Sequence, residues 1–510
     1  MKISKIFAGA AVAALCLASC TKSLQELNAR FPNLESGKIQ LSSGETSGAE
    51  FTLSDVRDYA ISYSVECEYA DEYKINVSFT SGYSKGIVTI TAPDVIFEDV
   101  TFDVKVMFSD SLGGRTSSAA FEVEAKANEN VVFFKESANC FLASPGAIAV
   151  FPLCKGNTKE KSDVEILELG WQDEKGLFKS CTLYDADNGC VVFNSGKEGN
   201  AVVNGIGADS TVVWSWHFWV AKDAPKEVVV GDYTFLDRNL GALNLDEKSE
   251  LSVGVAYQYG RKDPFTGIRF GAYEQRPVFN AVGDTLEVSI VNVSAETIDN
   301  MQNAIENPMI FYNNKYLSGS GNKHNYSWIT YDCTQYGAER FTALWNNGGK
   351  KSVNDPCPAG YTVASVEAWT AAKALNVTEL WDNDYETFDA SSIGTYEKYI
   401  VGNKKKVQFR GCVYGDLRLT ITGEINSNSN AFSFANCIGK PLPTAEVWCR
   451  DEDPDFASKI NASYFRGQAA KVNTTGNGNY EDISAIKVNA LSFTKYGLHY
   501  ALPVRCVKEK

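Results

Sequence analysis

The 510-residue sequence predicts a mostly β, multi-domain protein, in which two β-sandwiches are followed by an α+β domain. Two observations lead to this fold class. Short segments that alternate apolar and polar residues recur through residues 31–230, with turn-forming residues between them, as is typical of β-sandwiches. Beyond residue 230 the alternation gives way to long irregular stretches around few regular elements. Such stretches are typical of loops that carry function or are held by disulfides.

Residues 1–19 are predicted to be a lipoprotein signal peptide, because Lys2 and Lys5 precede an apolar run that is too short to span a membrane. The letters LASC, which end at Cys20, resemble the bacterial lipobox. This resemblance implies that Cys20 is acylated and becomes the mature N-terminus; cleavage elsewhere is the alternative. Residues 20–30 form a polar tether. We therefore expect a membrane partner through a lipid anchor, in the outer membrane and on the cell surface, with the periplasmic face as the alternative.

Residues 31–127 are predicted to form the first sandwich. Segments 74–80, 86–93 and 100–110 alternate apolar and polar residues, and no helical period of comparable length competes with them. The motif GYSKG at 82–86 has the spacing of a nucleophile elbow, but an elbow requires a helix after it. A strand follows here, so a hairpin turn is favoured. The region resembles the Ig-like modules found near the anchor of Bacteroidetes surface lipoproteins.

Residues 128–230 are predicted to form a second small sandwich. The region opens with NCFLASPGAIAVFPL and closes with VVWSWHFWV. Both stretches resemble a repeated module of Bacteroidetes exported proteins, which begins with an Asn-Cys-aromatic strand and ends with an apolar, Trp-rich strand. Cys181 and Cys190 are candidates for a disulfide that closes a hairpin within this region.

Residues 231–510 contain four blocks that resemble, in order and rough spacing, the Fibrobacter succinogenes major paralogous domain family. More distantly they resemble the C-type-lectin and formylglycine-generating-enzyme fold. The resemblance implies a C-type-lectin-like domain whose two ends pair and in which a helix with a Trp follows a Pro-rich turn. Tyr259 stands where the family usually has Trp. Independently, Ser365 as an N-cap predicts a helix over 366–375. The blocks are Asp237–Ala242, Tyr257–Phe265, Asn354–Tyr361 and Leu502–Val507.

The sequence has 13 cysteines, and 11 remain once Cys16 leaves with the signal and Cys20 is acylated. An odd number leaves at least one thiol free or paired with another chain, and export permits disulfides. If the ends of the C-terminal domain pair as the resemblance implies, Cys357 and Cys506 are the preferred disulfide; two free thiols are the alternative. The three histidines lie far apart in the sequence, so no metal site and no cofactor are expected.

Ligand recognition is predicted in the long irregular region, where exposed aromatic groups would stack on a ligand and amides would bond its polar groups. The alternative is that the two tryptophans belong to the core, because large aromatic side chains are mostly buried. The candidate ligand-binding residues are Tyr326, Trp328, Trp345, Asn346 and Asn347.

The stretch AYQYGRKDPF at 256–265 looks catalytic in isolation but is one of the four blocks. We interpret it as scaffold, in which Gly260 lets the chain turn and Arg261 pairs with a carboxylate or caps carbonyl groups. A ligand contact through Arg261 or Lys262 is the alternative.

The formal charge of −15 repels phosphate backbones, so nucleic acid is not an expected partner. The acidic stretches 381–384 and 450–456 are interpreted as solvated loops, since calcium needs six to eight oxygens. No catalytic residues are apparent. We expect a binding or adhesion protein whose C-terminal head recognises a glycan or a protein. The alternatives are a tip-like structural subunit of a surface pilus or complex, and an enzyme of uncharacterised type.

Overall fold

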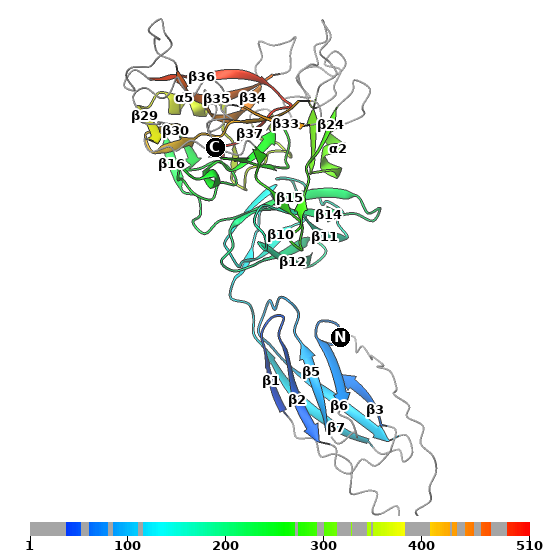
Figure 1. The fold of residues 1–510 in the computed structure, drawn as a ribbon. Helices are drawn as coiled ribbons and strands as arrows, with labels where there is room; N and C mark the ends of the chain where they lie inside the picture. The colour runs from blue at the N-terminus through cyan, green and yellow to red at the C-terminus, as the bar shows by residue number, and fades with distance from the viewer. Residues whose placement is uncertain are drawn as a thin grey trace, which may run out of the picture. The chain divides into compact units, whose positions relative to one another are not determined.

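The protein is mostly β and divides into two compact units, Met1–Val131 and Val132–Lys510, in a computed structural model (Figure 1). The signal peptide, the tether and Cys20 lie outside the described residues. No helix among the residues that are described is long and apolar enough to cross a membrane. The structure describes residues 37–52, 61–79, 85–110, 116–270, 274–292, 300–313, 328, 344–347, 350–382, 408–428, 431–435, 444–452, 461–470 and 487–510.

The N-terminal unit is a two-layer β-sandwich. Its strands are β1 (Gly37–Leu41), β2 (Thr46–Thr52), β3 (Ile61–Glu66), β4 (Lys74–Phe79), β5 (Lys85–Thr91), β6 (Val100–Asp110) and β7 (Thr116–Ala125). One sheet has the order β1-β7-β6-β3 and the other β2-β5-β4. β1 runs parallel to β7, while the other pairs are antiparallel. The strands β4 and β5 form the hairpin that the sequence predicts around GYSKG.

The alternation in β6 places its apolar side chains in the core between the sheets. Phe102, Val104 and Val106 are buried, whereas Asp103 and Lys105 between them face solvent. Side chains of successive strand residues point to opposite faces of a sheet, so this pattern fixes which face is covered. The first sandwich is therefore confirmed, and it has a hydrophobic core of its own.

The C-terminal unit begins with a second sandwich. Its sheets have the orders β12-β13-β10-β8 and β23-β22-β11-β14-β15-β9. A cluster of aromatic rings fills the space between them, with Phe141, Phe151 and Phe218 in mutual contact. The strands are β8 (Val131–Phe133), β9 (Cys140–Ala143), β10 (Ile148–Pro152), β11 (Ile166–Gln172), β12 (Phe178–Leu183), β13 (Asn188–Phe193), β14 (Gly199–Ile206), β15 (Val212–Val220), β22 (Val278–Phe279) and β23 (Thr285–Leu286).

This second sandwich and the C-terminal region form one compact unit rather than two separate ones. The strands β22 and β23, which follow residue 230 in the chain, extend the sheet of β11. The strand β15 is buried on both faces: Trp216 and Phe218 point into the sandwich core, while Trp219 joins the core of the C-terminal region. The alternation of apolar and polar residues ends near residue 230, but the chain does not divide into independently packed units there, because the C-terminal region covers the outer face of β15.

Short strands and a few helical turns make up the rest of the unit. The principal sheets have the orders β16-β17-β38-β28, β19-β18-β37-β32-β33, β29-β30-β31 and β34-β35-β36. The elements are β16 (Glu227–Val230), β17 (Tyr233–Leu236), η1 (Glu250–Ser252), β18 (Val255–Gln258), β19 (Phe265–Thr266), β20 (Ile268–Arg269), β21 (Glu274–Gln275), β24 (Ser289–Asn292), α2 (Asn300–Glu306), β25 (Ile310–Asn313), β26 (Asn346–Asn347), β27 (Lys350–Lys351), β28 (Tyr361–Val363), α5 (Val366–Lys373), β29 (Val377–Asp382), β30 (Gln408–Tyr414), β31 (Leu417–Thr420), β32 (Glu424–Asn428), β33 (Ala431–Ala435), β34 (Thr444–Glu452), β35 (Asn461–Ala470), β36 (Lys487–Gly497), β37 (Ala501–Pro503) and β38 (Cys506–Lys508).

The two ends of the C-terminal region pair with each other. β38 lies between β17 and β28, so Val507 is the partner of both Phe235 and Thr362. The predicted pair Cys357 and Cys506 forms a disulfide, with the two Cα atoms 5.9 Å apart. Strand pairing and the disulfide therefore hold the end of the chain against its earlier blocks.

The predicted helix is present as α5, and Ser365 caps it by accepting a hydrogen bond from the amide of Ala368. Its Trp369 is fully buried and packs on Phe235. The helix thus closes one side of a second core in this unit, as amphipathic helices commonly do.

The predicted hairpin disulfide is absent: Cys181 and Cys190 are both free. β12 and β13 do form an antiparallel hairpin, but Cys181 lies opposite Val191, whereas Cys190 lies opposite Thr182. Neighbouring residues on a strand point to opposite faces, so the two sulfur atoms lie on different sides of the sheet.

Candidate ligand-binding site

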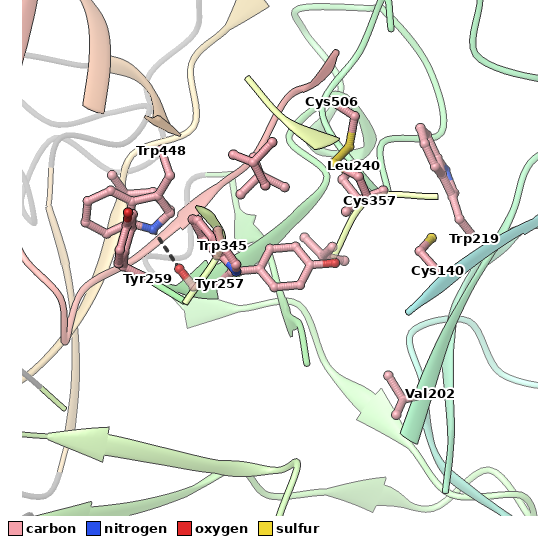
Figure 2. Packing of buried hydrophobic residues seen from close by; sticks show 14 of the residues in the cluster. Cys140, Val202, Trp219, Leu240, Tyr257, Tyr259, Trp345, Cys357, Trp448 and Cys506 are labelled. Carbon is pink, nitrogen blue, oxygen red and sulfur yellow. Dashed lines mark hydrogen bonds between the residues drawn. A yellow bond between two sulfur atoms is a disulfide. The ribbon is translucent and has the colours of Figure 1, made fainter. Parts of the chain in front are cut away.

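The two tryptophans predicted to bind a ligand are core residues. Trp328 and Trp345 are fully buried, and their indole N–H groups donate to the backbone oxygens of Tyr259 (2.9 Å) and Arg261 (3.2 Å). Figure 2 shows Trp345 beside Tyr259, whose ring in turn packs on Trp448. The prediction is wrong for these two residues, because the carbonyl groups of the AYQYGRKDPF turn satisfy the polar end of each indole and allow burial.

For the other three residues, ligand binding stays a prediction. Tyr326 lies outside the described residues. Asn346 and Asn347 form β26, which pairs with β27 in a short hairpin. Of the five candidates, the structure therefore describes the side chains of Trp328 and Trp345 alone, and both are buried.

The stretch 256–265 is scaffold. Arg261 is 1% exposed and donates to the carbonyl oxygens of Ile310 (2.5 Å), Pro308 (2.9 Å) and Asn307 (3.1 Å). Gly260 adopts a φ of +84°, and a Cβ atom there would lie 2.5 Å from the side chain of Leu344. Arg261 is thus held by loop carbonyls, as the scaffold interpretation requires.

Lys262 is also internal, at 3% exposure. Its ammonium group donates to Asp263 Oδ1 (2.8 Å) and to the hydroxyl of Ser215 on β15 (2.5 Å). A buried charge is tolerated when its partners are this close. The residue therefore joins the AYQYGRKDPF turn to the second sandwich, and the alternative of a ligand contact is overturned for Arg261 and Lys262 alike.

An open pocket of about 300 Å³ lies where the second sandwich meets the C-terminal region. Its walls come from the turn after β11, the turn before β14, the DRNLGALN loop, η1 and the segment after β21. We call it the seam pocket. It is lined by Asp173, Glu174, Gly196, Lys197, Glu198, Leu243, Leu251 and Arg276.

A buried ion pair between Asp173 and Arg276 forms part of the seam pocket lining. The side chains are 2% and 7% exposed. Asp173 also accepts from the backbone N–H (2.6 Å) and the side-chain amide (2.9 Å) of Asn200, whereas the buried Nε of Arg276 has no hydrogen-bond partner among the described residues. The carboxylate is held in place by several donors, and this part of the lining is therefore preorganised.

A chain of hydrogen bonds leads inward from this pair. Asn200 Nδ2 donates to Asp173 and to the carbonyl oxygen of Gly241, so its Oδ1 is left to accept from Nε2 of His217 (2.9 Å). Nδ1 of His217 then accepts from the hydroxyl of Tyr257 (3.3 Å). Burial lowers the pKa of His217 to about 3, so the imidazole is neutral at physiological pH.

The rim of the seam pocket is more exposed. Glu174 and Lys197 form an ion pair of 2.6 Å, with both side chains close to half exposed. Glu198 accepts a hydrogen bond from the backbone N–H of Lys222 (3.1 Å). Two leucine side chains add an apolar wall. The described residues contain no group of three or more His, Cys, Asp or Glu that could hold a metal ion.

Reasoning from the sequence missed these pocket residues. Asp173 and Arg276 are 103 positions apart, and only the joining of the sandwich to the C-terminal region brings them together. The available signal is the strand VVWSWHFWV. Its apolar run, interrupted only by Ser215 and His217, is typical of a strand buried on both faces, which places a further layer over the second sandwich.

The fold and this pocket define a multi-domain β protein with a small surface site. No protein-family model matches the sequence, and a search of curated proteins gives no match. Among solved structures, Plasmodium falciparum protein Pf12p is similar at 8% identity over 37% of this chain and 93% of its own, with a TM-score of 0.22. The zebrafish RET cadherin-like domains 1 to 4 align at 11% identity over 38% of this chain and 50% of theirs, with a TM-score of 0.17. The titin Ig tandem domains A164-A165 align at 12% identity over 37% of this chain and 95% of theirs, with a TM-score of 0.14. TM-scores this low carry no argument about function.

Proposed function

We propose that the protein is a lipid-anchored cell-envelope binding protein and that the seam pocket is its ligand site. The observation that carries the proposal is an open pocket lined partly by a buried ion pair, Asp173 with Arg276, and bordered by exposed polar groups. Pockets of this kind, with an apolar wall and a few fixed polar groups, are the usual form of small-ligand sites.

A binding role is favoured over a catalytic one by the partners of the pocket carboxylates. Asp173 is paired with Arg276, Glu174 is paired with Lys197, and Glu198 accepts a backbone N–H. A general acid or base needs a pKa near the working pH and a free proton position. Asp173 and Glu174, which are already paired with cations, are better suited to orienting a ligand than to moving protons.

The anchor part of the proposal rests on the sequence of residues 1–20, and the relationship to the Fibrobacter succinogenes major paralogous domain family rests on the four blocks. The blocks contact each other in the structure: Arg505 donates to Asn239 Oδ1 at 3.0 and 2.8 Å, and Tyr257 is the strand partner of Leu502. Their mutual contacts support a shared structural role for the blocks.

Palmitate labelling tests the anchor. Cells that express the natural protein should incorporate labelled palmitate into it, and Cys20→Ala should abolish that label. Unchanged labelling of the variant would contradict acylation at Cys20.

A bulky substitution in the pocket tests the site. Leu251→Trp should fill the seam pocket, and Leu375→Trp, at a side chain that is 37% exposed elsewhere on the unit, is the matched control. A panel of soluble glycans and short peptides is screened by calorimetry against the full-length protein. Binding should be lost only in Leu251→Trp, and equal binding by both variants would place the ligand elsewhere.

A further inference from the structure

We infer that the seam pocket is built for a hydroxyl-rich ligand without negative charge, namely a single sugar residue of a glycan. The inference rests on the proposed function and names the ligand class of the same site. It follows from the arrangement of charge in the pocket, from the hydrogen-bonding capacity left there and from the apolar wall.

The pocket interleaves charges of both signs. Asp173, Glu174 and Glu198 supply three carboxylates, while Lys197 and Arg276 supply two cations. Asp173 pairs with Arg276 and Glu174 pairs with Lys197, so the carboxylate of Glu198 is the excess charge of the lining. Like charges brought together in a desolvated site are costly, so an anionic ligand meets repulsion from this carboxylate. A neutral ligand meets none.

Hydroxyl groups can use the hydrogen-bond donor and acceptor positions that these side chains still have available. A carboxylate has about four acceptor positions. Among the hydrogen bonds between described residues, Glu198 uses one of these acceptor positions for the backbone N–H of Lys222. The ammonium group of Lys197 has three N–H donors, of which one is directed at Glu174. A hydroxyl group both donates and accepts, so neighbouring hydroxyls of one sugar ring can bond a carboxylate and a cation together.

The apolar wall completes the match. Leu243 and Leu251 provide an aliphatic surface against which the C–H face of a sugar ring can pack. The volume of about 300 Å³ is at the lower end of the range for small-molecule sites, which favours one ring over an extended oligomer. The remainder of a glycan would leave through the open mouth.

The test uses three sugars that share one ring and differ in charge: methyl glucoside, glucosamine and glucuronate, with the same series in the galactose and mannose configurations. Their binding to the purified full-length protein is measured by saturation-transfer NMR and calorimetry. At least one neutral sugar should bind in the millimolar range, and its carboxylate analogue should bind at least about fivefold more weakly, the effect of roughly 1 kcal/mol of repulsion.

Two carboxylate variants test whether the pocket makes this distinction. Glu198→Gln should weaken the neutral sugar about fivefold, because a charge-assisted hydrogen bond becomes a neutral one. The control is Glu160→Gln, which removes a surface carboxylate that pairs with Lys155 at 2.6 Å, the same distance as between Glu174 and Lys197. The control should leave the affinity for the sugar unchanged. Equal effects of both variants would contradict the inference.

The remaining outcomes separate the inference from the proposed function. Two results overturn the inferred ligand class and leave the pocket as a ligand site, provided that the binding is lost in Leu251→Trp. One is tighter binding of the carboxylate sugar than of the neutral one, and the other is binding of a peptide but of no sugar. A neutral sugar that binds equally well to Leu251→Trp overturns the pocket itself.

Discussion

Protonation of His217 should make the stability of the C-terminal unit depend on pH. The imidazole is 2% exposed and bonded to Asn200 and Tyr257, and burial lowers its pKa to about 3 from 6.5. In the unfolded chain the same group is protonated below pH 6.5. The unfolded state therefore binds more protons than the native state between pH 6.5 and pH 3, and this contribution to stability is lost as pH falls through that window.

The magnitude follows from the two pKa values. At pH 5 the unfolded imidazole is protonated about 30 times more often than not, while the native one stays neutral. The free energy of unfolding should therefore fall by about 2 kcal/mol between pH 7 and pH 5 because of His217 alone. Other groups titrate in the same range, so the quantity to measure is the difference between the natural protein and His217→Gln.

Tryptophan fluorescence isolates this effect, because all nine tryptophans lie at or beyond Trp171 and report only on the C-terminal unit. Urea unfolding at pH 7 and pH 5 should show a loss about 2 kcal/mol larger for the natural protein than for His217→Gln, whose amide does not titrate. An equal loss in both proteins would refute the reasoning that a buried, neutral His217 resists protonation.

Three further outcomes are expected. Replacing both Cys357 and Cys506 by Ala should lower the free energy of unfolding by up to about 5 kcal/mol, since the bond closes a loop with a sequence separation of 149; a loss below 1 kcal/mol in urea unfolding would contradict its role. Arg505→Met should cost roughly 3 kcal/mol in the same assay, because the carbonyl oxygens of Leu236 and Arg418 lose a buried donor; an unchanged midpoint would contradict this. Val104→Ala should cost roughly 2 kcal/mol in the N-terminal unit, seen by circular dichroism, while the fluorescence transition stays in place; a shifted fluorescence transition would show that the units are coupled.

Local patterns in the sequence predicted local structure well. The alternation in 100–110 predicted β6, and Ser365 predicted the start of α5. Both depend on neighbours within a few residues, which the sequence displays directly. The scaffold role of Arg261 was also predicted, although the carbonyl groups it binds, at residues 307, 308 and 310, could not be named.

The parts that the sequence did not predict depend on contacts between distant segments. Trp328 was expected to face a ligand, but its N–H finds a carbonyl oxygen 69 positions earlier, and composition alone does not show that such a partner exists. The domain boundary at residue 230 was placed where the alternation of apolar and polar residues ends. In the structure, β15 packs on both faces and so joins the second sandwich to the C-terminal region. The seam pocket exists only because of that joining, so no motif marks it.

Hydrogen–deuterium exchange with a bound sugar tests most directly whether the seam pocket is the ligand site. The full-length protein is compared with and without the neutral glycoside that binds it best. Slower exchange should appear at residues 173–176, 196–200 and 243–252, which border the seam pocket. Protection confined to residues 322–332 and 341–349, around the buried tryptophans, would contradict the assignment and return the ligand to the region that the sequence first indicated.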